Sequence, residues 1–485
     1  MYFYISILTF YIPFSIYILY TEQYITENNF WRLIMSVNAS SNFYHIYPLG
    51  LCGCPKKNDF CQPAGDGLRR LANELEKIKE GGANSILIGP LFESTSHGYD
   101  TVDYFHVDRR LGTNDDLKFF AKKCHSLGMN LVFDAVFNHS GRDFFAFKSV
   151  QQDGWNSRYK DWYSNIRFDG RSPFGDNFTY DNWAGCADLV KYNLENPEIQ
   201  EHLFSAVKMW IDEFGVDGLR LDATDTISFN FMKRLKNVTH EKRGDFWLMG
   251  EVVHGDYNRW VNPEMLDSVT NYQLHKGLWS SFNDKNFFEV AYSLNRQFGN
   301  SGQNTEKLFY NFVDNHDVNR IASTLKNKND LFPLYAMLFT IPGIPSIYYG
   351  SEMGIQGTRN QNGDVNLRPS LPPFGQIPEF AQPQVDSEKL RSIIKAYSNI
   401  REHSPALQYG NYEQVFLSNT EFVFLRHTEE QNALAVFNVN DETKKIRLHN
   451  IRQGIYTDTM TGEKLNLHAG AEIEVAAHSA RIFIN

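Results

Sequence analysis

Short apolar runs alternate with amphipathic stretches from residue 43 to about residue 405. The apolar runs predict strands, and the stretches between them place apolar residues near the 3.6-residue period of a helix. The predicted strands are 43–48, 85–88, 131–136, 218–222, 247–252, 308–313 and 346–349. The predicted helices are 66–80, 115–127, 197–214, 229–236, 334–339 and 387–402.

This alternation predicts a parallel sheet with helices on its faces. Continuous apolar strands such as 131–136 indicate burial on both faces. A run at 268–272 supplies an eighth strand, so we expect a (β/α)8 TIM barrel. A doubly wound open sheet is the alternative, but no glycine-rich phosphate loop follows the first strand.

Two segments depart from the barrel pattern. The stretch 138–192 is far longer than an ordinary strand–helix loop, and it predicts a small subdomain inserted after the third strand, at about 139–192. Beyond Ala406 the period changes to two, with strands expected at 422–425, 433–438, 445–448 and 480–484. We therefore expect a catalytic barrel over 41–405 and a C-terminal antiparallel β-sandwich over 406–485.

The first forty residues form a separate hydrophobic N-terminal extension. The run 2–20 is long enough to span a bilayer, but no Lys or Arg precedes it and no clear cleavage site follows. It is interpreted either as a signal anchor or as a mis-called start, with translation beginning at Met35. The second interpretation predicts a cytoplasmic protein, and the first predicts a secreted or membrane-anchored one.

Composition and charge narrow the functional class. The formal net charge is −10, which argues against nucleic acid as a partner, since its binders carry basic faces. The five cysteines do not predict a disulfide framework, and the spacing of Cys52, Cys54 and Cys61 matches no zinc pattern. The bulk numbers are those of a globular protein that binds a neutral ligand.

Charged and imidazole side chains stand where the predicted strands end. In a barrel, catalytic residues come from this C-terminal face, contributed by several strands. One such residue would be read as a cap or turn, but four successive strand ends are hard to explain that way. The segments are Asp134-Ala-Val-Phe-Asn138-His139, Gly218-Leu-Arg220-Leu-Asp222, Gly250-Glu251-Val252 and Asp314-Asn-His316-Asp317.

In their order and spacing, these segments resemble the four short motifs of the α-amylase family of glycoside hydrolases. The resemblance runs from about residue 43 to the C-terminus. It includes His97-Gly-Tyr99-Asp100 and the segment from Gly343 to Glu352. It implies retaining hydrolysis of α-glucosidic bonds in α-linked glucose oligosaccharides, for which two carboxylates stand about 5–5.5 Å apart.

The resemblance also implies a role for each residue. Asp222 matches the nucleophile, Glu251 the general acid/base, and Asp317 the carboxylate that stabilises the transition state. Arg220 lies two residues before Asp222, so both side chains share one strand face, and the cation would keep Asp222 ionised. The remaining matches are Tyr99 as a platform under the sugar, His139 and His316 as hydroxyl ligands, and Asp134 as a structural aspartate.

No cofactor is required by the resemblance, although calcium is left open. Asn138 is the expected calcium ligand, with Asp188 as its candidate partner. The residues after Asp222 are Ala223-Thr224-Asp225 in place of the Lys-His pair of many endo-acting amylases. We therefore expect short maltodextrins as substrates, as for α-amylases, cyclomaltodextrinases or α-glucosidases that act on small oligomers.

Two alternatives differ in class from a hydrolase. A hydrophobic N-terminal span before an amylase-like domain is also typical of non-catalytic membrane-anchored partner subunits, some of which have lost carboxylates that this chain keeps. A transglycosylase on α-glucosides would use the same residues, with a sugar hydroxyl in place of water. The sequence does not address the oligomeric state.

Overall fold

The computed structural model describes residues 36–361 and 363–485. The predicted N-terminal hydrophobic run and the question of a start at Met35 lie outside these residues. Among the described residues, no helix combines the length and the apolar character needed to cross a bilayer.

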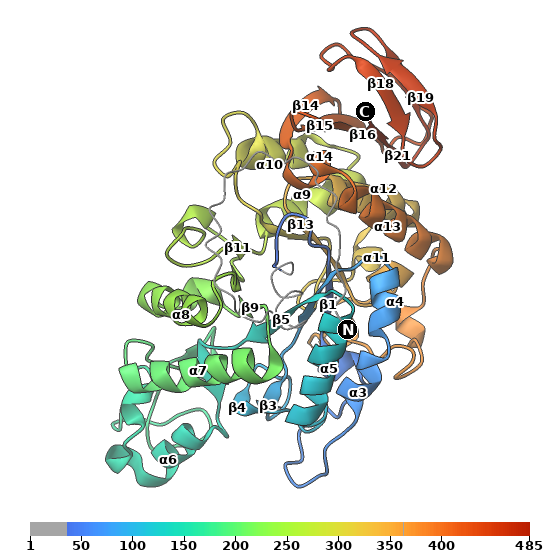
Figure 1. The fold of residues 1–485 in the computed structure, drawn as a ribbon. Coiled ribbons are helices and arrows are strands. Elements are labelled where there is room, and N and C mark those ends of the chain that lie inside the picture. The colour runs from blue at the N-terminus through green and yellow to red at the C-terminus, as the bar shows by residue number, and fades with distance from the viewer. Residues whose placement is uncertain (1–35, 362) are drawn as a thin grey trace, which may run out of the picture. The chain divides into compact units, whose positions relative to one another are not determined.

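Eight parallel strands form the central sheet, in the order β11-β10-β9-β5-β2-β1-β13-β12 (Figure 1). The ends of this order meet, because Thr270 bridges Tyr310 in parallel and the N–H of Asn271 donates to the Tyr310 carbonyl (2.9 Å). The sheet is therefore a closed barrel, as predicted. Its strands are β1 (Phe43–Ile46), β2 (Ser85–Ile88), β5 (Asn130–Ala135), β9 (Gly218–Leu221), β10 (Trp247–Gly250), β11 (Ser268–Val269), β12 (Tyr310–Phe312) and β13 (Ile344–Tyr348).

Helices surround the barrel (Figure 1). They start at recognisable caps: the Thr113 hydroxyl accepts from the Asp116 N–H in a capping box, and Asn196 caps a helix whose first residue is Pro197. The helices are α2 (Pro48–Leu51), α3 (Gly67–Ala72), α4 (Leu75–Glu80), α5 (Asn114–Ser126), α7 (Pro197–Met209), α8 (Phe229–Lys242), α9 (Tyr272–Asn283), α10 (Phe288–Phe298), α11 (Ile321–Thr324), α12 (Leu331–Thr340), α13 (Ser387–Glu402) and α14 (Pro405–Tyr409).

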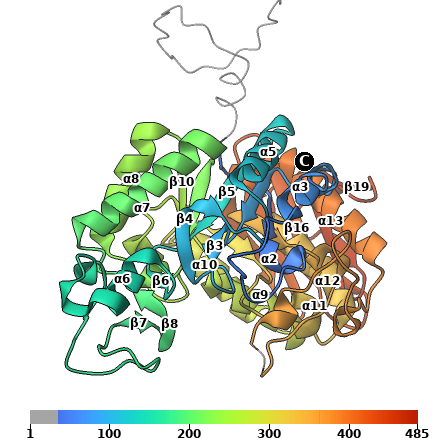
Figure 2. The same cartoon turned by 90° about the horizontal axis from the view of Figure 1, so that it is seen from below.

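Two loops at the C-terminal ends of strands are enlarged. After β2, the chain forms the antiparallel pair β3 (Phe92–Ser94) and β4 (Thr101–Val107). After β5, the long insertion contains α6 (Phe145–Asp153) and a three-stranded sheet of β6 (His139–Gly141), β8 (Cys186–Lys191) and β7 (Asn182–Trp183). Figure 2 shows α6, β6, β7 and β8 gathered together at one side of the barrel.

The C-terminal segment forms antiparallel sheets with a core of their own. Val423, Leu434, Ile446 and Ile473 are buried in this core. A six-stranded sheet contains β14 (Asn411–Leu417), β15 (Glu421–His427), β16 (Asn432–Asn438), β21 (Ser479–Ile484), β18 (Gly454–Asp458) and β19 (Lys464–Leu467). A second sheet pairs β17 (Lys444–Arg447) with β20 (Glu472–Val475).

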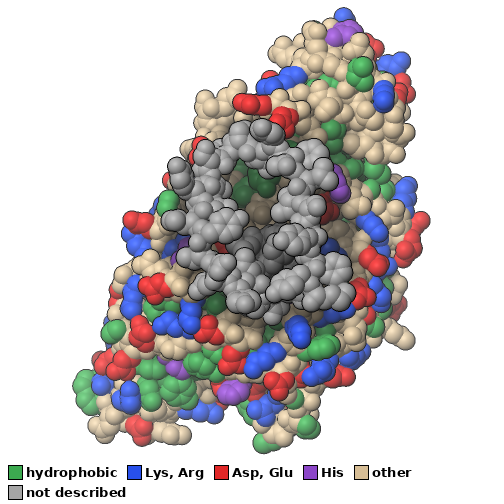
Figure 3. Space-filling model, viewed as in Figure 1, with side chains coloured by type: hydrophobic (Ala, Val, Ile, Leu, Met, Phe, Trp, Pro, Cys, Tyr) green, Lys and Arg blue, Asp and Glu red, His purple; other side chains and the backbone are tan. Residues whose placement is uncertain are grey.

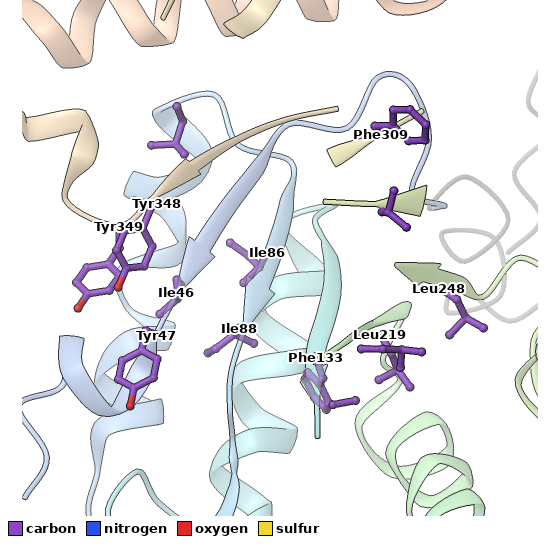
Figure 4. Close-up of a cluster of buried hydrophobic side chains, with 14 of the residues drawn as sticks. Ile46, Tyr47, Ile86, Ile88, Phe133, Leu219, Leu248, Phe309, Tyr348 and Tyr349 are labelled. Carbon is purple, nitrogen blue, oxygen red and sulfur yellow. The ribbon is translucent and has the colours of Figure 1, made fainter. Parts of the chain in front are cut away.

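The two faces of the barrel strands belong to different cores. Ile86, Phe133 and Leu219 pack outward against the helices, as Figure 4 shows. Val132 and Met249, of opposite parity, fill the barrel interior. Since side chains alternate along a strand, the residues two positions beyond the interior ones are aimed at the mouth of the barrel. This parity carries the strand-end polar residues into one site.

Candidate active site

Arg220 is the centre of the site. From β9, its Nη1 donates to Asp134 Oδ1 at the end of β5 (2.7 Å) and to Asp222 Oδ1 (3.1 Å). Its Nη2 lies 2.9 Å from Glu251 Oε2, just after β10. Neighbouring strands pair Asp134 with Arg220 and Gly250 with Leu221, so the barrel register itself brings the three carboxylates to one guanidinium. The structure thus unites four residues predicted from the strand ends.

The turn after Asp222 is strained. Ala223 has φ +46° and ψ 42°, the left-handed region that a residue with a Cβ rarely occupies. In this conformation its N–H donates to Glu251 Oε2 (3.1 Å). The turn therefore ties the Glu251 carboxylate to the residue that follows Asp222.

Burial and charge act against each other at Asp222. Burial raises the pKa of this carboxyl, the Arg220 guanidinium opposes the rise, and the carboxylates of Glu251 and Asp134 add to it. The pKa of Asp222 stands well above its usual range as a result. Asp222 and Glu251 share the Arg220 guanidinium, which holds the two carboxyl groups side by side.

Aromatic rings and a histidine border the carboxylates. The Tyr99 and His316 rings are stacked with centroids 5.6 Å apart, and Tyr47 lies parallel to His316 at 5.9 Å. The Tyr99 hydroxyl donates to Asp134 Oδ2 (2.8 Å) and also contacts His316 Nε2. Tyr99 and His316 thus lie together beside Asp134.

Asp317 has a histidine and an arginine as partners of its own. His316 Nε2 lies 2.9 Å from Asp317 Oδ2, and Arg368 Nη2 lies 2.8 Å from Oδ1. Burial raises the pKa of Asp317, but His316 and Arg368 outweigh burial and hold the pKa below its usual range. Asp317 is therefore ionised, and its side chain is 31% exposed toward the mouth of the barrel.

His139 contacts the backbone of Tyr99. Its Nε2 contacts the Tyr99 carbonyl oxygen (3.1 Å), and its ring lies 6.0 Å from that of Trp183 on β7. Burial lowers the pKa of His139 to about 4, so the ring is neutral near pH 7. A neutral imidazole has one donor and one acceptor nitrogen, so it is suited to binding a sugar hydroxyl.

Several residues that touch these groups were not predicted. The Tyr272 hydroxyl lies 3.4 Å from Glu251 Oε1, and Asn315 Nδ2 donates to that hydroxyl (3.1 Å). Arg368 stacks over Tyr47, with 4.6 Å from its guanidinium carbon to the ring centroid. Asn315 stands within a quoted motif. The long loop that holds Arg368 carries no periodic signal that could have singled it out.

The two residues named for a calcium site, Asn138 and Asp188, do not lie together. Asn138 is buried with its Oδ1 unpaired, and its carbonyl accepts from the Tyr192 N–H. Asp188 is exposed on β8, four residues before Tyr192. At strand spacing these two residues are roughly 13 Å apart, so Asp188 is distant from Asn138. Within the described chain, no group of three or more His, Cys, Asp or Glu side chains is arranged to hold a metal ion.

Charged side chains of both signs share the surface. On the described residues that Figure 3 leaves visible, Lys and Arg side chains are interspersed with Asp and Glu.

Comparison with known proteins gives the family. The family model "Alpha amylase, catalytic domain" matches residues 45–447. A cyclomaltodextrinase from a Bacillus species is 30% identical over 424 residues, which are 82% of this chain and 72% of the relative. The intracellular maltogenic amylase of Bacillus subtilis is 27% identical over 423 residues, which are 85% of this chain and 68% of the relative.

The fold of this chain is also found in a solved enzyme structure. The ligand-free cyclic α-maltosyl-(1→6)-maltose hydrolase of Arthrobacter globiformis superposes with a TM-score of 0.77 at 24% identity, covering 92% of this chain and 98% of that one. These relatives are named as enzymes, so they give no support to a non-catalytic partner subunit. By the extent of the family match and by its relatives, the chain belongs to the α-amylase family of glycoside hydrolases.

Proposed function

We propose that this enzyme hydrolyses α-1,4-glucosidic bonds of short maltodextrins with retention of anomeric configuration. The observation that carries the proposal is the single Arg220 guanidinium that holds Asp134, Asp222 and Glu251 together. Two of these carboxylates would flank a glycosidic bond, as double displacement requires.

In the first step, Glu251 gives its proton to the glycosidic oxygen while an Asp222 oxygen attacks the anomeric carbon. The carbon–oxygen bond to the leaving sugar breaks, and a glycosyl ester of Asp222 forms. The acid role places a proton on Glu251 at the start of this step, and the Arg220 guanidinium beside Asp222 favours the ionised form of that carboxyl. Asp317, ionised beside Arg368, faces the positive charge that develops on the sugar ring.

In the second step, the Glu251 carboxylate takes a proton from water, and the water oxygen attacks the anomeric carbon. The ester bond to Asp222 breaks, and both carboxyl groups return to their starting states. Tyr99 supplies the platform under the reacting sugar, His139 and His316 bind its hydroxyls, and Asp134 orients Arg220.

The proposed substrate range rests on the relatives and on one departure from the endo-acting pattern. Relatives named cyclomaltodextrinase and maltogenic amylase indicate small linear or cyclic maltodextrins. The turn after Asp222 carries Ala223 and Thr224, both buried, in place of a Lys-His pair. We therefore expect maltotriose to maltoheptaose and cyclomaltodextrins to be cleaved faster than polymeric starch, which end-group assays on equal masses of substrate would measure.

The proposed location is the cytoplasm, since one relative is named an intracellular enzyme. Fractionation of the native host separates this proposal from the alternatives. Recovery in the membrane pellet or in the medium would contradict it.

The decisive experiment compares wild type with Asp222→Asn on maltoheptaose. We expect a loss of about 10⁴-fold or more in kcat in the variant, since the amide oxygen is a poor nucleophile. Early products followed by NMR would carry the α-anomer, as retention requires.

The matched control is Asp115→Asn, at the exposed side of α5, where 85% of the carboxylate side chain is accessible. This variant also replaces a carboxylate with an amide and should keep wild-type activity. Equal rates for the two variants would contradict Asp222 as nucleophile. Products longer than maltotriose, formed from maltotriose at high concentration, would indicate transglycosylation.

A further inference from the structure

The two carboxylate oxygens of Glu251 have different partners. Oε2 lies 2.9 Å from Arg220 Nη2 and accepts from the Ala223 N–H (3.1 Å). Oε1 lies 3.4 Å from the Tyr272 hydroxyl. Two N–H donors occupy Oε2, so a proton on Glu251 belongs on Oε1. The Tyr272 hydroxyl therefore meets the oxygen that would exchange protons with substrate.

Tyr272 is held firmly in this position. It is the first residue of α9, directly after the short strand β11. Its ring packs edge-on against Phe312 (centroids 4.9 Å apart) and against His275 (6.1 Å). Burial, Glu251 and Asp317 raise the pKa of Tyr272 well above its usual range, so its hydroxyl keeps its proton.

Asn315 fixes the direction of this hydroxyl. Its Nδ2 donates to the Tyr272 oxygen (3.1 Å), while its Oδ1 accepts from the N–H groups of Asp317 (2.8 Å) and Val318 (3.1 Å). Since Asn315 supplies a donor to the phenol oxygen, the phenol proton is left to point at Glu251. The same asparagine shapes the turn that carries Asp317.

We propose that Tyr272 is a positioning residue for Glu251, donating a hydrogen bond to Oε1 whenever the carboxyl is ionised. The inference rests on the acid/base role proposed for Glu251. When Glu251 gives its proton to the leaving oxygen, the Tyr272 O–H turns to the new carboxylate and stabilises it. When Glu251 takes the proton from water, that hydrogen bond is released. Through Asn315, the acid/base is also linked to the turn of Asp317.

The test compares wild type, Tyr272→Phe and a matched control, Tyr310→Phe. Tyr310 is also a buried barrel phenol, but its hydroxyl pairs with Ser346. Two substrates are used. The leaving sugar of maltoheptaose must be protonated to depart, whereas the acidic phenol that leaves an aryl α-maltoside departs with little help from a proton. kcat/KM is measured across pH for each, with thermal unfolding as a check on folding.

For Tyr272→Phe we expect kcat/KM on maltoheptaose to fall about 10- to 100-fold, and on the aryl maltoside by about threefold or less. The alkaline limb of the maltoheptaose profile reports the acid of the free enzyme. Loss of a donor to the ionised carboxylate moves this limb to higher pH, by about one unit. The Tyr310→Phe profile should superpose on that of wild type.

A second substitution reverses the sign and preserves the fold. Site-specific 3-fluorotyrosine at position 272 makes the phenol a stronger donor, and the alkaline limb should move to lower pH. Equal losses on both substrates with unmoved limbs would overturn the proposal and leave Tyr272 a packing residue. If wild type cleaves neither substrate, the proposed function fails instead, so the two failures are distinguishable.

Discussion

At the scale of single residues, the turn after Asp222 joins strain to chemistry. Ala223 is buried with φ +46°, and in this conformation its N–H donates to Glu251 Oε2 (3.1 Å). Strained backbone of this kind gathers at functional sites because the surrounding contacts enforce it. Here the contact enforced is the one that orders Glu251, the proposed acid/base, beside Asp222, the proposed nucleophile.

This strain makes opposite predictions for two substitutions of Ala223. Valine is β-branched and tolerates a left-handed backbone poorly, so Ala223→Val should lower the free energy of unfolding by about 2 kcal/mol. Glycine adopts this region freely, so Ala223→Gly should stay within about 1 kcal/mol of wild type. Urea denaturation measures both, and equal stability of the two variants would contradict the assigned conformation.

The strand-end rule predicted the residues whose position depends on the barrel alone. Asp134, Arg220, Asp222 and Glu251 follow from strand parity and register, which the apolar pattern reveals. Arg368 could not be predicted in this way, because it reaches Asp317 from a long loop without periodicity. Tyr47 and Tyr272 lie within the predicted strands 43–48 and 268–272, where an aromatic residue is indistinguishable from the rest of the apolar run.

At the scale of elements, the β7–β8 hairpin of the insertion brings a side chain to the site. Its two turn residues have positive φ, +50° at Ala184 and +86° at Gly185, as in the tight hairpin turns whose twist matches that of the strands. Trp183 immediately precedes this turn, half-buried, with its ring 6.0 Å from that of His139. The hairpin therefore sets a large aromatic face beside the proposed hydroxyl ligand.

From this placement we expect Trp183 to contact a bound sugar. Trp183→Ala should raise KM for maltoheptaose about five- to tenfold with kcat nearly unchanged, since a stacking contact is made in ground and transition states alike. Steady-state kinetics measures the split. Trp155→Ala is the control, because Trp155 lies in the same insertion but is 69% exposed and packs on Phe168. A fall in kcat at constant KM would instead mean that Trp183 acts by orienting His139.

The predicted boundaries differ from the structure where two helices share one apolar stripe and where a strand is very short. The helix predicted at 66–80 is two helices, α3 and α4, with a turn at Asn73 and Glu74. Leu71 and Leu75 remain buried on either side of that turn, so periodicity does not reveal the break. The strand predicted at 268–272 is only Ser268–Val269, because α9 begins at Tyr272. Helices α9 and α10 were not predicted.

At the scale of the whole described chain, buried polar groups join the barrel to the C-terminal sheets. Arg426 of β15 donates to the carbonyls of Gly410 (2.8 Å) and of Thr340 in the barrel (2.9 Å). Arg401 of α13 donates to the carbonyl of Leu407, beyond the end of the barrel (2.7 Å), and burial lowers the pKa of Arg401 to about 10. Separating the barrel from the C-terminal sheets would leave buried carbonyls without hydrogen-bond donors, which costs free energy. The contacts at this joint between the barrel and the sheets therefore hold the two parts as one unit.

A second contact across the joint depends on pH. His478, in the turn before β21, places Nδ1 2.6 Å from Asp330 Oδ1 on the barrel and Nε2 2.9 Å from Asp441 Oδ1. Asp441 also pairs with Lys285 of the barrel (2.6 Å). Both ring nitrogens face carboxylates, which is the environment of a charged imidazolium with two donors.

The sign of the pH effect follows from the pKa of His478. Burial favours the neutral ring, but the hydrogen bonds to Asp441 and Asp330 outweigh it and raise the pKa of His478 above its usual range. Because the folded pKa exceeds the unfolded one, the stabilisation is complete below about pH 6.5 and is lost as the pH rises through the folded value. His478→Gln should therefore lower Tm at pH 6 by about 1–3 °C and by less at pH 9. The control is His468→Gln, at an exposed histidine of the same domain, which should leave Tm unchanged at both pH values. An equal fall in Tm for His478→Gln at pH 6 and pH 9 would show that the imidazolium charge contributes nothing to the joint.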